Sequence, residues 1–249
     1  MVPDKLHYLR LMGITPWIRR DLASSLVHTP QETVAATDIA EPGKGGVMSA
    51  LSAEQPMPTE LLDWDALRAR VAACQRCELH ATRTQTVFGV GAPNADLMIV
   101  GEAPGEREDA LGEPFVGRAG QLLNAMLQAI GLDRKSVFIS NVLKCRPPRN
   151  RDPKIEESMQ CGPYLDRQIA LVRPKLLLAV GRIAAQTLLQ TKISIGRLRG
   201  RQHRYGVSDL PLLVTYHPAY LLRSPAEKYR AWQDLKQVRR MLEERALGD

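Results

Sequence analysis

The chain has 249 residues, of which 44% are hydrophobic and 24% charged, and its formal net charge is +7. This length suffices for one sizeable α/β core, and no apolar stretch approaches the roughly 18 residues that a spanning helix needs, which argues against a membrane protein. The positive charge belongs to the body, because residues 1–60 carry five Lys or Arg against seven Asp or Glu, which leaves +9 on residues 61–249. A basic body suits nucleic acid as a partner without proving it.

The N-terminal segment is set apart by its composition. Over residues 1–22, Leu6, Leu9 and Met12 recur at helical spacing, which predicts a short helical motif. Its charges are interleaved rather than ordered as in a secretory signal, so we expect a cytoplasmic protein. Residues 23–60 lack sustained periodicity and are rich in Ala, Ser, Thr, Pro and Gly, which indicates a flexible linker. A short helix on such a tether either folds back on the body or docks on a partner, and the sequence leaves both open.

Strands and helices alternate through residues 61–249, which we interpret as one domain. The alternation predicts an α/β fold, a three-layer sandwich with a short, central, mostly parallel sheet. Buried strands are recognised by apolar runs and helices by amphipathic periodicity. We expect strands over residues 96–102, 136–142, 174–181 and 211–217, and the main helices over residues 64–74, 120–131, 155–172 and 226–246.

Four positions stand at or directly after the ends of these predicted strands: Gly101-Glu102, Asn141, Gly181 and His217. Ligands of open α/β sheets bind in the crevice outside the carboxyl ends of the strands. We therefore expect these four positions to converge on one crevice.

The chain has four cysteines, with Cys74 and Cys77 in a CxxC pair and Cys145 and Cys161 farther along. In a reducing cytosol, spaced cysteines hold metal more often than they form disulfides. Four thiolates suit an iron–sulfur cluster or a tetrahedral zinc ion, although the wide second pair differs from the two knuckles usual for zinc. Buried cysteines without any ligand are a third alternative. The spacing leaves all three open.

A glycine-containing loop, GEAPGEREDALGEPFVGRAG, occupies residues 101–120. Gly101 and Gly105 would let a ligand approach the backbone closely, although the loop matches neither a Walker motif nor GxGxxG. Phe115 lies in this loop. Such an aromatic residue is either a plug of the core or a platform on which an extruded base stacks.

Asn141 opens the segment NVLKCRPPRNRDP. Its amide offers a donor and an acceptor together, which complements the O4 and N3–H edge of uracil. Arg146 and Arg149 follow beside Cys145, and they are either phosphate contacts or part of a solvated face.

His217 follows the last predicted strand and is either structural or placed to stabilise negative charge on a base oxygen. We expect an exposed loop after it, with Leu221 as a wedge into the DNA duplex and Arg223 as a DNA contact. Upstream, Arg199 and Arg201 belong to a dense basic segment that either binds the phosphate backbone or forms a basic hairpin.

The loop over residues 101–120, the segments NVLKCRPPRNRDP and HPAYLLR, and the four spaced cysteines resemble the family 4 uracil-DNA glycosylases over about residues 70 to 243. The resemblance implies a monofunctional hydrolase that flips uracil from DNA, cuts its N-glycosidic bond and leaves an abasic site for base excision repair. It also implies that the four cysteines hold a 4Fe–4S cluster. We expect a monomer in the bacterial cytosol, associated with the nucleoid.

The resemblance also assigns roles to single residues. It implies that Phe115 stacks on uracil, that Asn141 reads its polar edge and that His217 supports the departing uracil anion. Related families carry a water-activating aspartate where this chain has Ala103, which implies a dissociative route in which stabilising the anion matters more than a strong base. Gly101 and Ala103 are expected to line the substrate. The carboxylates left to position water are Glu102 and Glu108, of which Glu108 would also help to exclude the methyl group of thymine.

Residues 5–21 contain YLRLMGITPWIRRD, which resembles the opening of the psi subunit of the bacterial DNA polymerase III clamp-loader complex. This second resemblance implies a tether to the clamp loader. The main alternative to an enzyme is a non-catalytic iron–sulfur module that binds DNA. Such a module would need only the arginines, whereas Phe115, Asn141 and His217 favour the enzyme.

Overall fold

The computed structural model describes residues 10, 12, 13 and 58–246. The motif predicted over residues 1–22 and the linker predicted over residues 23–60 therefore lie outside the described residues, apart from residues 10, 12, 13 and 58–60. A short 3-10 turn, Thr59–Leu61, begins the described body.

A six-stranded sheet with the order β1-β3-β2-β4-β6-β5 forms the centre. The four inner strands are parallel, and the two edge strands run antiparallel to their neighbours. The prediction of a mostly parallel sheet is thus confirmed. The strands are β1 Val90–Gly91, β2 Leu97–Gly101, β3 Phe138–Asn141, β4 Leu176–Val180, β5 His203–Tyr205 and β6 Leu210–Thr215.

The two edge strands were not predicted, because each has only two or three half-buried or exposed residues and no apolar run. β5 lies inside the basic segment that precedes β6, and β5 and β6 pair as an antiparallel hairpin. The hairpin alternative for this segment is therefore the correct one.

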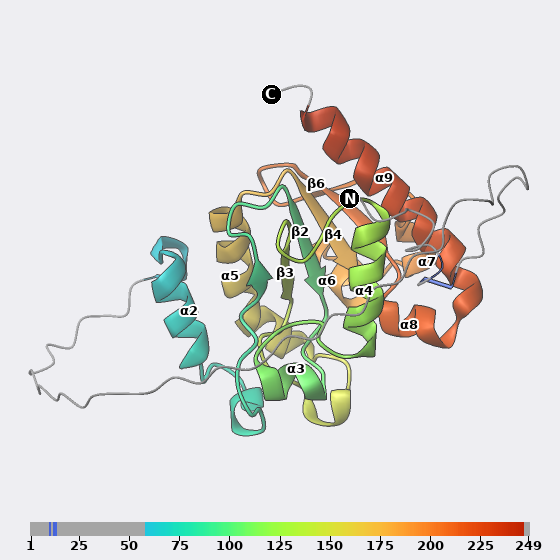
Figure 1. Cartoon of the computed structure of the whole chain (residues 1–249). Helices are drawn as coiled ribbons and strands as arrows, with labels where there is room; N and C mark the ends of the chain where they lie inside the picture. Colours follow the sequence, from blue (N-terminus) through green and yellow to red (C-terminus); the bar gives the residue numbers. More distant parts are fainter. Residues whose placement is uncertain (1–9, 11, 14–57, 247–249) are drawn as a thin grey trace, which may run out of the picture.

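Helices cover both faces of the sheet, with α2 and α5 on one side and α4, α8 and α9 on the other (Figure 1). This arrangement confirms the three-layer sandwich. The helices are α2 Trp64–Ala72, α3 Glu106–Leu111, α4 Arg118–Ala129, α5 Ile155–Val172, α6 Arg182–Leu188, α7 Ile195–Leu198, α8 Pro218–Arg223 and α9 Lys228–Ala246.

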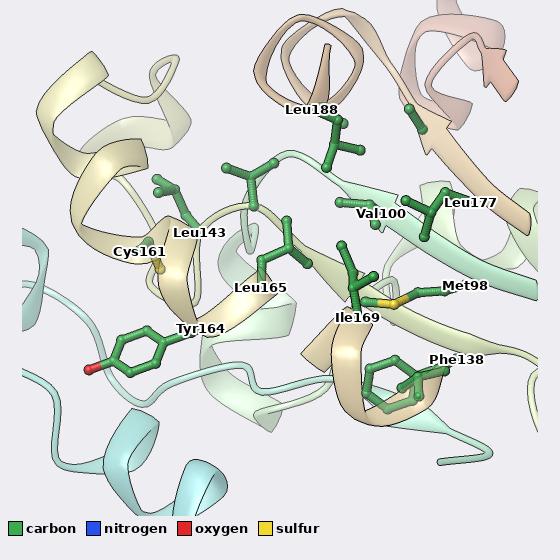
Figure 2. Close-up of a cluster of buried hydrophobic side chains, with 14 of the residues drawn as sticks. Met98, Val100, Phe138, Leu143, Cys161, Tyr164, Leu165, Ile169, Leu177 and Leu188 are labelled. Atoms are coloured by element: carbon green, nitrogen blue, oxygen red, sulfur yellow. The ribbon is translucent and has the colours of Figure 1, made fainter. Parts of the chain in front are cut away.

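The four inner strands are buried on both faces, so their side chains divide between two cores. In β2, Met98 and Val100 pack on the α5 side, whereas Leu97 and Ile99 pack on the α4 side. This division follows from the two-residue repeat of an extended strand. Figure 2 shows the first core, in which Leu165 and Ile169 of α5 face residues of the sheet.

Met12 is fully buried in the second core, which also contains residues of α4, α8 and α9. A side chain added at the neighbouring Gly13 would come within 2.8 Å of the Lys228 Nζ at the start of α9. At this point the N-terminal segment packs on the body, as the fold-back alternative requires. Among the helices of the described ranges, none combines the length and apolar character needed to cross a membrane.

Candidate active site and cysteine pocket

The carboxyl ends of β2, β3, β4 and β6 open into one cleft of about 770 Å³. This arrangement confirms the expected convergence of strand ends, although at β2 the lining begins at Glu102 and does not include Gly101. Among the residues that line the cleft are Glu102 and Ala103 after β2, Asn141 at the end of β3, Gly181 after β4 and His217 after β6.

Phe115 forms one wall of the cleft and is buried. Its backbone has a φ of 55°, a left-handed conformation that non-glycine residues adopt only when their surroundings enforce it. Arg134 supplies part of that enforcement, because its guanidinium donates to the carbonyl oxygens of Pro114 at 2.8 Å and Phe115 at 3.2 Å. The Phe115 ring lies 5.5 Å from the His217 ring, centroid to centroid, with a tilt of 30°. The surroundings therefore fix the position of the aromatic wall.

Asn141 is 2% exposed, and its Oδ1 is the buried side-chain polar atom of the described residues that has no hydrogen-bond partner. An unsatisfied buried acceptor costs about 1–3 kcal/mol, so a folded protein rarely keeps one without use. Gly101 makes the placement possible, since a Cβ there would lie 2.4 Å from the Asn141 Oδ1 and 2.7 Å from the Phe115 ring. The amide oxygen is thus a buried, unpaired acceptor packed against Gly101, in a residue that lines the cleft.

His217 precedes α8 and caps it, because its Nδ1 accepts the backbone N–H of Ala219 at 3.2 Å. Burial and, to a smaller extent, the charge of Arg223 lower the pKa of His217 to about 4, although the charge of Glu108 opposes the shift. The ring is therefore neutral near pH 7. Because Nδ1 accepts a hydrogen bond, the proton of the neutral ring resides on Nε2. His217 is a neutral donor in the wall of the cleft.

The two candidate carboxylates, Glu102 and Glu108, differ in their hydrogen bonds and in their electrostatic surroundings. The Glu108 Oε1 accepts the backbone N–H groups of Val116 at 2.9 Å and Gly117 at 3.0 Å, so this side chain braces the loop that carries Phe115. Burial and the nearby charge of Asp152 raise the pKa of Glu102 to about 7, although Arg182 opposes the shift. Glu102 is the carboxylate whose proton affinity suits transfer near neutral pH.

Asp152, Arg182 and Tyr216 are among the residues of the cleft that were missed from the sequence. Asp152 and Arg182 form an ion pair at 2.5 Å, and both influence Glu102. Arg182 follows Gly181 directly at a strand end, a position that could have identified it. The sequence does not reveal that Arg134 holds the backbone at Phe115, because the hydrogen-bond acceptors are backbone carbonyls, which every residue has.

The expectation that Arg199 binds DNA is wrong. Its guanidinium makes two hydrogen bonds to the Asp234 carboxylate, at 2.8 and 3.0 Å, and lies 4.9 Å from the Tyr216 ring centroid. Only 13% of its side chain is exposed. Arg199 therefore holds α9 against the body and is not free for phosphate.

The other predicted arginines lie at or near the surface. Arg149 and Arg201 are exposed, and Arg223 is exposed at the rim of the cleft. Arg146 is half-buried, and its Nε donates to the Asn150 Oδ1 at 2.8 Å.

The expectation of an exposed loop after His217, with Leu221 as a wedge, is wrong. The segment is the helix α8, and Leu221 is fully buried in the second core. Its neighbour Tyr220 is 37% exposed and lines the cleft, with its ring 5.1 Å from that of Tyr216.

All four cysteines line a second pocket. Cys74 and Cys77 follow α2, Cys145 follows β3, and Cys161 lies in α5, where Figure 2 shows it beside Leu143. The Arg83 Nη1 donates to the Cys145 Sγ at 3.1 Å, and the backbone N–H of Lys144 donates to the Cys161 Sγ at 3.3 Å. Within the described ranges, no group of three or more His, Cys, Asp or Glu residues is arranged to hold a single metal ion.

Comparison with known proteins identifies the family. The model of the uracil DNA glycosylase superfamily matches residues 88–236. The chain is 42% identical to a type-4 uracil-DNA glycosylase of Sulfurisphaera tokodaii, over 71% of this chain and 84% of the relative. It is 43% identical to one of Archaeoglobus fulgidus, over 70% and 90%. A type-5 uracil-DNA glycosylase of Pyrobaculum aerophilum is 29% identical over 62% of this chain and 74% of the relative. The chain belongs to the uracil DNA glycosylase superfamily and, within it, to the type-4 enzymes.

Proposed function

We propose that this uracil-DNA glycosylase, a hydrolase of N-glycosyl bonds in DNA repair, binds an extruded uracil in the cleft and releases it to leave an abasic site. The observation that carries the proposal is the unpaired Oδ1 of Asn141, which is buried beside Phe115 and His217. A base whose edge offers a donor would satisfy this atom.

Base selection follows from the chemistry of an amide. The Asn141 Oδ1 accepts the N3–H of uracil, and its Nδ2 donates to O4, whereas cytosine presents the opposite pattern. The ring of Phe115 stacks on the base. Glu108 and Gly105 lie together, because a Cβ at Gly105 would come within 2.7 Å of the Glu108 Oε2. We assign this crowded side to the C5 edge, where the methyl group of thymine would not fit.

Bond cleavage is dissociative. The bond between the sugar C1′ and the base N1 breaks with its electron pair on the base, so the sugar becomes oxocarbenium-like and uracil leaves as an anion. The Nε2–H of His217 donates to the O2 of this anion. A neutral donor fixed in position stabilises developing negative charge without reorganisation at the moment of reaction. This role does not require an imidazolium, in agreement with the lowered pKa of His217.

Water completes the reaction. Its oxygen bonds to C1′, and Glu102 in its ionised form orients the water and takes its proton. Ala103, which stands where related families have an aspartate, offers no carboxylate for this purpose. Glu108 is already held by two backbone N–H groups, so we assign the water to Glu102.

Replacing Glu102 with glutamine is expected to lower kcat by about 10²-fold, the lower end for a general base, because the route is dissociative. The wild-type rate should rise with pH through about 7, since only the ionised carboxylate accepts a proton and its pKa is raised to about 7. The variant should lose this rise. Single-turnover rates on a uracil oligonucleotide, measured across pH, provide the test.

A matched control is Asp152→Asn, because the charge of Asp152 helps to raise the pKa of Glu102. This variant should keep the rise in rate and move it to lower pH. A Glu102→Gln profile with the same rise as the wild type would remove Glu102 from the mechanism.

We infer that the four cysteines hold a 4Fe–4S cluster, as the type-4 resemblance implies. All four line one pocket, and cluster ligands bind separate iron atoms, so they need not converge on a single point as zinc ligands do. When bound, such a cluster supplies a rigid link between α2, α5 and the segment after β3, and it takes no part in breaking the glycosidic bond. Iron content and visible absorbance of the purified protein would separate the cluster from zinc.

Tyr220 is the candidate to contact the DNA that surrounds the vacated space, because Leu221 is buried. Tyr220→Ala is expected to weaken binding of duplex DNA about 10-fold, since stacking on a base contributes about 1–3 kcal/mol. Leu221→Ala should instead destabilise the fold by about 2–5 kcal/mol. Fluorescence binding and thermal unfolding of both variants check this. Weakened DNA binding in Leu221→Ala with an unchanged melting temperature would restore Leu221 as the wedge.

A uracil oligonucleotide tests the activity itself. The purified protein should produce alkali-labile sites in a strand with one uracil, and none in a matched strand with thymine. Absence of scission, with an intact cluster, would favour the non-catalytic DNA-binding module instead.

We also propose that residues 5–21 bind the clamp loader and that the enzyme is otherwise a monomer. The support is the resemblance to the psi subunit, in a segment that lies outside the described residues except for residues 10, 12 and 13. Met12 is buried against the body, so binding requires it to leave this contact. A synthetic peptide of residues 5–21 should bind the clamp loader, and absence of binding would remove the proposal. Light scattering of the full chain reports its oligomeric state.

A further inference from the structure

Lys144 is a buried cation between the two sites. It is 1% exposed and lies in sequence between Asn141 of the cleft and Cys145 of the cysteine pocket. Its Nζ donates at 2.7 Å to three acceptors: the Ser140 Oγ, the Asn141 backbone oxygen and the Gln168 Oε1. An ammonium has three N–H groups, so all of its donors are used.

These three acceptors are neutral, yet a buried ammonium is stable only when negative charge compensates it. The groups whose negative charge would act on Lys144 are the Asp166 carboxylate and, once they are thiolate ligands, Cys161 and Cys145. The contact with Cys161 is direct, because the backbone N–H of Lys144 donates to the Cys161 Sγ. Two of the three groups are cysteines of the pocket. A cluster held by four thiolates carries net negative charge and would supply the missing compensation.

On the other side, Lys144 belongs to the network that fixes the end of β3. The Ser140 Oγ and the Gln168 Nε2 both donate to the Phe88 backbone oxygen, at 3.2 and 2.8 Å. This network ties β3 to α5, and the Nζ of Lys144 pins the main chain of Asn141 within it.

The turn after Asn141 is also hydrogen-bonded to the start of the loop over residues 101–120. The N–H groups of Val142 and Leu143 donate to the backbone oxygens of Gly101 at 2.9 Å and Glu102 at 3.0 Å. A shift of Lys144 would therefore reach both the residue that reads uracil and the backbone of Glu102.

We propose that Lys144 is a positioning residue that couples the cysteine pocket to the uracil site. Its charge offsets the negative charge of the cluster, and its hydrogen bonds hold the Asn141 main chain so that the unpaired Oδ1 faces the base. The inference deepens the proposed function and rests on the cluster being present.

The test compares Lys144→Met with the wild type. Removing the positive charge should lower the reduction potential of the cluster, because the more negative, reduced cluster loses its compensating cation. Iron should be lost faster in the presence of a chelator. Cleavage of uracil DNA should fall by about 10- to 100-fold, the usual cost of losing a group that orients a site, and inhibition by free uracil should weaken about 10-fold.

Two further variants separate charge from geometry. Lys144→Arg keeps the charge but cannot place one nitrogen on all three acceptors, so it should keep the wild-type potential and lose uracil inhibition. Ser140→Ala removes one neutral acceptor of the network and keeps the Lys144 charge, so it should leave the reduction potential at the wild-type value, whatever its effect on uracil inhibition.

The inference is overturned if Lys144→Met keeps either the wild-type potential or the wild-type uracil inhibition, or if Ser140→Ala lowers the potential as much as Lys144→Met does. Should Lys144→Met fail to fold, Lys144→Arg decides, and wild-type inhibition by uracil in that variant overturns the inference. Failure of the proposed function looks different, because the wild-type protein itself would then lack iron or leave uracil DNA intact.

Discussion

Replacing His217 with leucine is expected to lower the single-turnover rate on uracil DNA by on the order of 10³-fold, as for loss of one oxyanion donor. The variant removes the Nε2–H that we assign to the O2 of the departing uracil. Binding of the base should be affected much less, because the developing charge exists only in the transition state. A rate within 10-fold of the wild type would contradict the assignment.

The pH dependence of the rate and of the stability provides a second test of His217. The lowered pKa of His217 keeps its ring neutral from about pH 7 down to about pH 4, so its protonation should not limit the rate between pH 5 and 7. Between the usual pKa of 6.5 and the lowered value, the unfolded chain binds a proton that the folded chain does not. The stability that His217 contributes is therefore present above pH 6.5 and falls as the pH decreases toward 4. Chemical unfolding at several pH values should show a smaller acid loss in His217→Leu.

The sequence predicted the sheet and the position of the cleft because both depend on strong local signals. Apolar runs such as the one through Leu97–Gly101 mark a strand buried on both faces, and parallel strands bring their carboxyl ends together. Hence the residue order alone was enough to place Asn141 and His217 in one cleft.

The errors concern features that depend on tertiary contacts. Arg199 is paired with Asp234, which lies 35 residues away, and no local pattern distinguishes such a pair from a free basic patch. The error at Leu221 was avoidable. Pro218 directly after His217 occupies the first helical position with a capping residue before it, which is a recognised signal for the start of a helix. A helix buries one side, and Leu221 lies on it.

Replacing Asn141 with leucine, a side chain of similar size, should abolish uracil excision while leaving the fold intact or more stable. Loss of both hydrogen bonds to the base is expected to lower kcat/KM by at least about 10³-fold, because discrimination by buried hydrogen-bonding groups reaches about 10⁴-fold. The variant also removes a buried acceptor that has no partner in the described part of the chain, so the free energy of unfolding should stay the same or rise by about 1 kcal/mol. Cleavage kinetics and urea unfolding of the same preparation measure the two effects.

The opposite signs make this test decisive. Replacing a residue that stabilises the fold lowers the activity and the stability of the protein together. Replacing a residue that serves only to bind the ligand lowers the activity alone. Gly101→Ala is the companion variant, because its added methyl group would lie 2.4 Å from the Asn141 Oδ1 and 2.7 Å from the Phe115 ring. Gly101→Ala should weaken inhibition by free uracil, because the added methyl group displaces the side-chain amide of Asn141. Asn141→Leu removes the same amide. A fall in both stability and activity in Asn141→Leu would show that the unpaired oxygen is a packing defect and not the contact that reads uracil.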